Sequence, residues 1–124
     1  MKRLIDESAL FDKDFCQYLL QSEEEYYLSA LSYLEYLSWQ LDKGNTPTMV
    51  DAFLAEMNIE IVPFGQKEVK EAIKLAKSSQ KNPMDLAGPA TATSQGVILI
   101  SNQEKEYSDI IPVESTRQFM ENNK

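Results

Sequence analysis

Histidine is absent from the 124 residues of the chain, and cysteine occurs once, at Cys16. Without an imidazole, Ser-His-Asp and Cys-His nucleophile pairs, histidine acid–base steps and histidine-ligated zinc are all excluded. A single thiol also excludes a disulfide within the chain and a cysteine-cluster metal site. The chemistry that remains open belongs mainly to carboxylates.

Long apolar runs are also missing. The chain reaches an acid at Asp6 before any stretch long enough for a signal peptide, and no window approaches the roughly 20 apolar residues of a membrane span. We therefore expect a cytoplasmic protein without membrane contact. With only 4 Gly and 5 Pro, 43% hydrophobic and 26% charged residues, the composition is globular. A length of 124 residues predicts a single domain over residues 1–124.

Basic residues are outnumbered. The 12 Lys and Arg against 20 Asp and Glu give a formal charge of -8. Such a charge disfavours indiscriminate adhesion to nucleic acid or to an anionic membrane. A phosphate ligand would need local positive charge or a bound cation.

Short apolar segments alternate with helical patterns along the chain. Strands are predicted at residues 3–5, 26–28, 59–62, 97–100 and 110–113, the last at a sheet edge. Helices are predicted at residues 8–19, 29–43, 47–57, 66–79 and about 84–96. The alternation predicts a three-layer α/β/α fold with a mainly parallel central sheet of four to five short strands. The helix at 29–43 is apolar almost all round, so we expect it to be largely buried.

Three acids stand at positions that favour a site. Asp6 directly follows the first predicted strand, and sites in parallel α/β folds lie beyond the carboxyl ends of strands. Glu35 has Leu31 and Trp39 as its helical neighbours, and Asp85 precedes a segment of small residues. Singly, these acids could be a helix cap, a surface position and a helix-start residue. Together, acids from separate elements are what a Mg²⁺ or Mn²⁺ site requires.

Three segments resemble the PIN-domain ribonucleases, including the VapC-type toxins of bacteria and archaea. LIDESAL is similar to the family's apolar strand followed by Asp-x-Ser, and SALSYLEYL is similar to its serine-led helix with a glutamate. NPMDLAGPATATSQGVILISN is similar to its aspartate helix running into glycine and an apolar strand. The order and separation of these segments carry the resemblance over nearly the whole chain.

The resemblance implies a Mg²⁺- or Mn²⁺-dependent endoribonuclease that hydrolyses phosphodiesters of single-stranded RNA, as the toxin of a toxin–antitoxin pair. By the same resemblance the catalytic, metal-binding residues are Asp6, Glu35 and Asp85. The implied supporting polar groups are Ser8, Asn102, Gln103 and Glu104. The family also implies a homodimer and an antitoxin protein whose helix masks an apolar groove near the site.

Two departures from the family pattern keep other functions open. Gln103 stands where family members place an acid or Asn, and Gly88-Pro89 could shift the helix that carries Asp85. The alternative reading is a PIN-like binding or assembly module with weakened catalysis. A phosphoacceptor receiver domain is a third reading, disfavoured because Ile100 leads to Ser101-Asn102 and not to a lysine.

Two surface patterns have competing interpretations. Lys67, Lys70, Lys74, Lys77 and Lys81 share one helix face and could follow a phosphate backbone. A solvated face in which Glu71 pairs with its lysine neighbours is the favoured alternative. Likewise, a face formed by Met49, Phe53 and Met57 could receive a partner, although core packing is slightly favoured.

Overall fold

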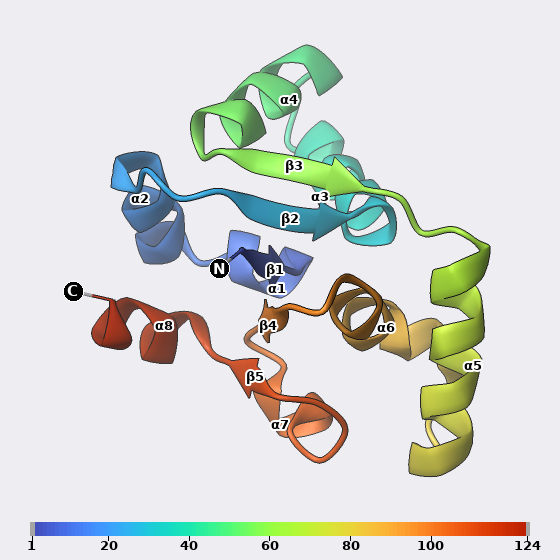
Figure 1. The fold of residues 1–124 in the computed structure, drawn as a ribbon. Helices are drawn as coiled ribbons and strands as arrows, with labels where there is room; N and C mark the ends of the chain where they lie inside the picture. Colours follow the sequence, from blue (N-terminus) through green and yellow to red (C-terminus); the bar gives the residue numbers. More distant parts are fainter. Residues whose placement is uncertain (1, 124) are drawn as a thin grey trace.

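Five short parallel strands form the central sheet of the computed structural model, which describes residues 2–123 (Figure 1). The strands are β1 (Arg3–Ile5), β2 (Tyr26–Ser29), β3 (Ile59–Val62), β4 (Ile98–Ile100) and β5 (Val113–Glu114). Their spatial order is β3-β2-β1-β4-β5, and all four pairings are parallel. Helices cover both faces, so the predicted α/β/α architecture is confirmed.

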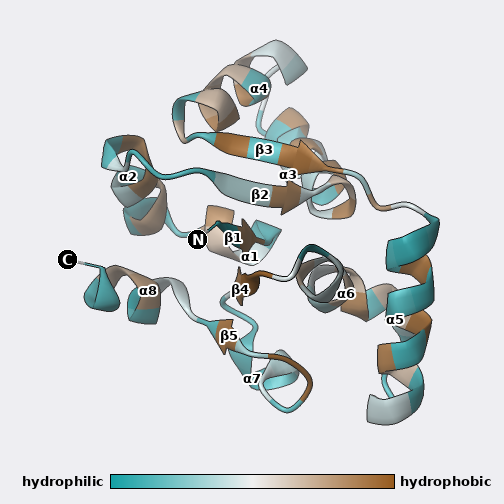
Figure 2. Ribbon diagram, in the orientation of Figure 1, coloured by the Kyte–Doolittle hydropathy of each residue, from teal (hydrophilic) through white to brown (hydrophobic). Residues whose placement is uncertain are grey.

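Two hydrophobic clusters hold the helices to the two faces of the sheet. Ile5 and Ile100 belong to the cluster formed with α1 (Glu7–Leu10), α2 (Lys13–Gln21), α3 (Ala30–Asp42), α4 (Pro47–Glu56) and α8 (Thr116–Asn122). Leu4 and Leu99 belong to the cluster formed with α5 (Gln66–Ser79), the 3₁₀ turn η1 (Pro83–Leu86), α6 (Ala87–Gln95) and α7 (Glu104–Tyr107). Successive strand residues face opposite sides, which explains why β4 is apolar throughout and why β1 is apolar at both Leu4 and Ile5, after Arg3 (Figure 2).

The predicted helix at 8–19 is two helices. Asp6, and not Ser8, caps α1, because its carboxylate accepts a hydrogen bond from the Ala9 backbone N–H. Asp12 then starts α2 by accepting from the N–H groups of Asp14 and Phe15 at 3.0 and 3.3 Å. Asp12, as a second capping acid, thus divides the single continuous helix that the apolar spacing alone predicts.

The expectation that the helix at 29–43 is largely buried is wrong. Only Ser32 and Tyr36 of α3 are buried, whereas Leu34 and Leu41 are 63% and 45% exposed. The predicted helix at 47–57 is confirmed as α4, and Thr46 caps it, since its Oγ1 accepts from the Met49 N–H at 3.2 Å. An exposed apolar face on α3 is therefore a surface property of this protein and not part of its core.

Of the strand predicted at 110–113, only Val113 belongs to β5, and two helices near it were not predicted. β5 pairs only through Val113 and Glu114, because Pro112 lacks the N–H that a ladder requires. Both α7 and α8 are short, which leaves little helical periodicity to detect in the sequence.

Pro89 does not kink the segment after Asp85. It is the third residue of α6, where its missing N–H would have had no partner within the helix. Asp85 lies one element earlier than expected, on η1 and not on the helix. α6 thus begins at Ala87, later than the predicted start near residue 84, and Asp85 precedes it.

No helix within residues 2–123 combines the length and the apolar character needed to traverse a lipid bilayer.

Phe119 on α8 tests how much this terminal helix contributes to stability. The ring is 1% exposed and packs edge-on against the rings of Phe15, Tyr18 and Tyr26. We expect Phe119→Ala to lower the free energy of unfolding by about 3–5 kcal/mol, measured by urea denaturation. The exposed Asn122→Ala on the same helix should change it by less than about 0.5 kcal/mol. Equal effects of the two variants would show that α8 is only loosely docked.

Candidate active site

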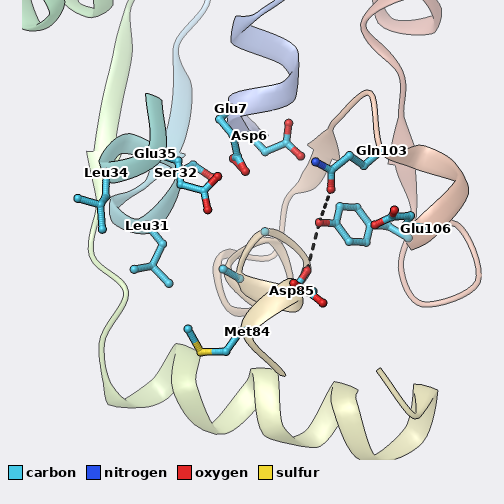
Figure 3. A pocket seen from close by; sticks show the side chains of 13 residues that line it. Asp6, Glu7, Leu31, Ser32, Leu34, Glu35, Met84, Asp85, Gln103 and Glu106 are labelled. Carbon is cyan, nitrogen blue, oxygen red and sulfur yellow. Dashed lines mark hydrogen bonds between the residues drawn. The ribbon is translucent and has the colours of Figure 1, made fainter. Parts of the chain in front are cut away.

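A cavity of about 340 Å³ opens at the carboxyl ends of β1 and β4 (Figure 3). Five acids from four parts of the fold line it: Asp6, Glu7, Glu35, Asp85 and Glu106. All three acids singled out in the sequence are therefore brought to the same cavity, although they lie far apart along the chain. Glu7 and Glu106 were missed by the sequence analysis.

Asp6 lies deepest, with 3% of its surface exposed. Ser8 Oγ donates to its Oδ1 at 2.5 Å, and the Ala9 N–H donates to the same oxygen at 3.2 Å. Burial raises the pKa of Asp6 to about 6, against the opposing effect of the Ser101 and Ser8 hydroxyls. The carboxylate is thus fixed in direction but carries a charge that its surroundings compensate incompletely.

The segment after β4 lies beside Asp6, as the parallel sheet predicts. The Asp6 N–H donates to the Ile100 carbonyl at 3.3 Å, and the Asn102 N–H donates to Ser8 Oγ at 2.9 Å. Ser8 and Ser101 hydroxyl oxygens lie 3.2 Å apart. Ser8 therefore links the carboxylate to the 101–104 segment.

Among the other predicted supporting residues, only Gln103 lines the cavity. The Asn102 side chain points to α8, where its Oδ1 accepts from the Thr116 N–H at 3.1 Å. Glu104 also lies outside the lining, with one carboxylate oxygen buried and without a hydrogen-bond partner in the described structure. The sequence predicts the strand end correctly but not which of its side chains turn inward.

Glu7 and Glu35 lie beside each other in the lining of the cavity (Figure 3). The pKa of Glu35 is raised by partial burial, then by the charge of Glu7 and a hydrogen bond with it. Glu7 Oε2 is buried, and no group in residues 2–123 bonds to it. The signal for Glu7 in the sequence is only its position next to Asp6.

Asp85, Gln103 and Tyr107 form the opposite wall. The Tyr107 hydroxyl lies 2.8 Å from Gln103 Oε1 and 3.2 Å from the backbone carbonyl oxygen of Asp85. Burial, followed by the charges of nearby acids, raises the pKa of Tyr107, so its hydroxyl keeps its proton. Tyr107 thereby ties α7 to η1 within this wall.

The donor set fits a hard divalent cation in type and charge. The charged side chains that line the cavity are all carboxylates, and Mg²⁺ and Mn²⁺ prefer oxygen ligands. The unpartnered Glu7 oxygen and the raised pKa values of Asp6 and Glu35 indicate negative charge without a counter-charge. Within residues 2–123, however, no three acid or thiol side chains are gathered closely enough to hold one ion together.

Replacing Asp6 tests the cost of its burial. Because its folded pKa of about 6 exceeds the ordinary value, ionising Asp6 destabilises the fold above that pH, and the cost vanishes below about pH 4. We expect Asp6→Asn, in EDTA, to raise the free energy of unfolding by about 1–3 kcal/mol at pH 7.5, with the gain fading towards pH 4. The exposed Asp109→Asn serves as the control. A gain of the same size at both pH values would contradict the charge argument.

Solved structures with the same fold include one described as a toxin–antitoxin complex. A toxin–antitoxin complex from Klebsiella pneumoniae matches with a TM-score of 0.74 and 17% identity, over 92% of this chain and 97% of that chain. VapBC2 from Rickettsia felis, bound to a DNA fragment from its promoter, matches with a TM-score of 0.65 and 18% identity, over 93% and 98%. A protein from Pyrobaculum aerophilum matches with a TM-score of 0.71 and 13% identity, over 98% and 94%.

Among curated proteins, none matches the sequence. The sequence profile of the PIN domain matches residues 5–110, which include all five acids of the cavity. This match covers most of the chain, agrees with the fold and removes the receiver-domain reading. The chain belongs to the PIN domain family.

Proposed function

We propose that the protein is a Mg²⁺- or Mn²⁺-dependent endoribonuclease that hydrolyses single-stranded RNA, as the toxin of a toxin–antitoxin pair. PIN domains are generally nucleases, so the hydrolase class follows from the family. The observation that carries the finer proposal is the convergence of Asp6, Glu35 and Asp85 on one cavity whose charged groups are all acidic. An RNA phosphate would be repelled there unless a cation came with it.

In this proposal Asp6, Glu35 and Asp85 would bind one or two ions, in part through water molecules that Mg²⁺ retains, since no three acids of the described residues are gathered closely enough to ligate one ion directly. When bound, such an ion polarises the phosphate, lowers the pKa of a bound water and offsets charge on the leaving oxygen. The protein supplies the geometry: the Ser8 hydroxyl and the Ala9 N–H fix the Asp6 carboxylate, and burial shields it from bulk water. No side chain forms a covalent intermediate.

The lysine face of α5 supports a nucleic-acid substrate. α5 carries four of the five lysines, because it ends at Ser79 and Lys81 lies beyond it. None of these lysines makes an ion pair with a carboxylate in the described part of the chain, so the expected pairing with Glu71 is not observed. Val69 and Ile73 of α5 are exposed as well. α5 packs against η1, which carries Asp85, so the helix that bears these lysines neighbours the cavity wall. In this proposal the lysines contact RNA phosphates.

An antitoxin partner is supported by the toxin–antitoxin complex among the structural neighbours. A second cavity, of about 520 Å³, lies between α3 and α4 and is lined in part by Met49 and Phe53. Met57, predicted on the same face, is fully buried instead. We propose that an apolar antitoxin segment binds here; the homodimer remains a prediction.

Cleavage of labelled single-stranded RNA tests the nuclease proposal. We expect the wild type to cleave with Mg²⁺ or Mn²⁺ and not in EDTA. Asp6→Asn, Glu35→Gln and Asp85→Asn should each reduce the rate by about 100-fold or more, because each removes a metal-binding oxygen. Asp109→Asn should leave it unchanged. A folded wild type that cleaves under no condition would instead favour the binding or assembly module.

Neutralising the lysine face tests the substrate contact. We expect the Lys70→Ala, Lys74→Ala, Lys77→Ala triple variant to bind single-stranded RNA more weakly. Each lost phosphate contact should lower the slope of log affinity against log salt by about 0.7. The measurement is fluorescence anisotropy across a KCl series, with the exposed Lys105→Ala as the single-charge control. An unchanged salt slope would return α5 to the role of a solvated face.

A further inference from the structure

Resting on the proposed function, we infer that Gln103 binds the substrate phosphate as a hydrogen-bond donor, through its amide nitrogen. The sequence comparison with the family suggests a poorer metal ligand at this position. The structure assigns Gln103 a different role, because its side-chain oxygen already accepts a hydrogen bond from the protein.

The orientation of the amide is set by Tyr107. The Tyr107 hydroxyl donates to Gln103 Oε1 at 2.8 Å, and the Gln103 nitrogen points into the cavity on the side of Asp6 and Glu7 (Figure 3). The two residues are one helical turn apart in and before α7, so the pair is held by local backbone. The backbone N–H of Gln103 donates to Ser101 Oγ at 3.0 Å, which fixes the backbone beneath the Gln103 side chain.

The single proton of Tyr107 has two acceptors to choose between. The Asp85 carbonyl oxygen lies 3.2 Å away, farther than Gln103 Oε1 at 2.8 Å, so the stronger bond is the one to Gln103. The buried hydroxyl keeps this proton at neutral pH. An amide with its oxygen occupied in this way presents two N–H groups to the cavity.

Gln103 is chemically unlike the rest of the lining. Among the described residues around the cavity it has the only side-chain N–H groups, whereas five neighbours are acids. Non-bridging phosphate oxygens accept hydrogen bonds from such groups. An acid at this position would add a sixth negative charge that faces the incoming phosphate, while a neutral amide donates to it.

The reverse orientation of the amide makes the opposite prediction. In that arrangement the nitrogen would donate to the Tyr107 hydroxyl oxygen, the hydroxyl would donate to the Asp85 carbonyl, and the amide oxygen would face the ion. Gln103 would then be a neutral metal ligand. Metal binding and RNA binding, measured separately, distinguish the two arrangements.

The experiment compares Gln103→Met and Gln103→Glu with the wild type. Mn²⁺ affinity is measured by calorimetry without RNA, and binding of a fluorescein-labelled single-stranded RNA is measured by anisotropy in Ca²⁺. We expect Gln103→Met to weaken RNA binding about tenfold, the size of a lost hydrogen bond to a charged group, with Mn²⁺ affinity unchanged. We expect Gln103→Glu to strengthen Mn²⁺ binding and to weaken RNA binding further.

Tyr107→Phe tests the positioning role of the hydroxyl. We expect a loss of RNA affinity of about threefold in the wild-type background and no further loss in Gln103→Met, because the hydroxyl acts through the amide. A purely structural effect of Tyr107 would persist in both backgrounds. Thermal unfolding of each variant confirms that it is folded.

Two results would overturn the inference by itself: Gln103→Met weakening Mn²⁺ binding with RNA binding intact, or Gln103→Glu improving both. Failure of the wild type to bind RNA under any condition would overturn the proposed function, and the inference with it. The two failures are thus separable by the behaviour of the wild type.

Discussion

The burial of one carboxylate at the end of the central strand governs this structure. Asp6 follows β1, the middle strand of the sheet, and is almost completely enclosed. Such a group is tolerated only with hydrogen bonds, a proton or a cation. Ser8 and Ala9 supply hydrogen bonds, yet the pKa remains raised to about 6. The ionised Asp6 therefore lowers the free energy of unfolding, and a bound cation would offset this loss.

Hydrophobic burial in the rest of the sheet offsets the loss of stability caused by Asp6. The strand residues Leu4, Ile5, Leu99 and Ile100 are completely buried. Ile5 and Ile100 pack in one hydrophobic cluster, and Leu4 and Leu99 pack in the other. Removing apolar surface of this kind from water contributes roughly 25 cal/mol per Å². Polarity is confined to the carboxyl edge, where the strands end and the acids of different elements meet.

Much of the fold was predictable because its signals are local. Apolar runs locate four of the five strands, and the predicted start of α4 at residue 47 is confirmed. Burial was less predictable: α3 has apolar residues all round, but only tertiary packing decides that Leu34 stays exposed. The same holds at the site. Position after a strand indicates Asp6, whereas the inward turn of Glu7 depends on neighbours that are distant in the sequence.

An acidic protein that acts on RNA must attract the strand with one surface and bind the reacting phosphate at another. The formal charge of -8 opposes approach, and ions in solution screen charges beyond about 10 Å at 0.1 M salt. Under the proposed function, the exposed lysines of α5 attract the RNA. The helix that bears them packs against η1, the turn that carries Asp85. Inside the cavity, where lysine is absent from the described lining, a cation and the neutral amide of Gln103 would meet the phosphate. An acid in place of Gln103 would favour the cation alone, so its neutrality divides the task between ion and amide.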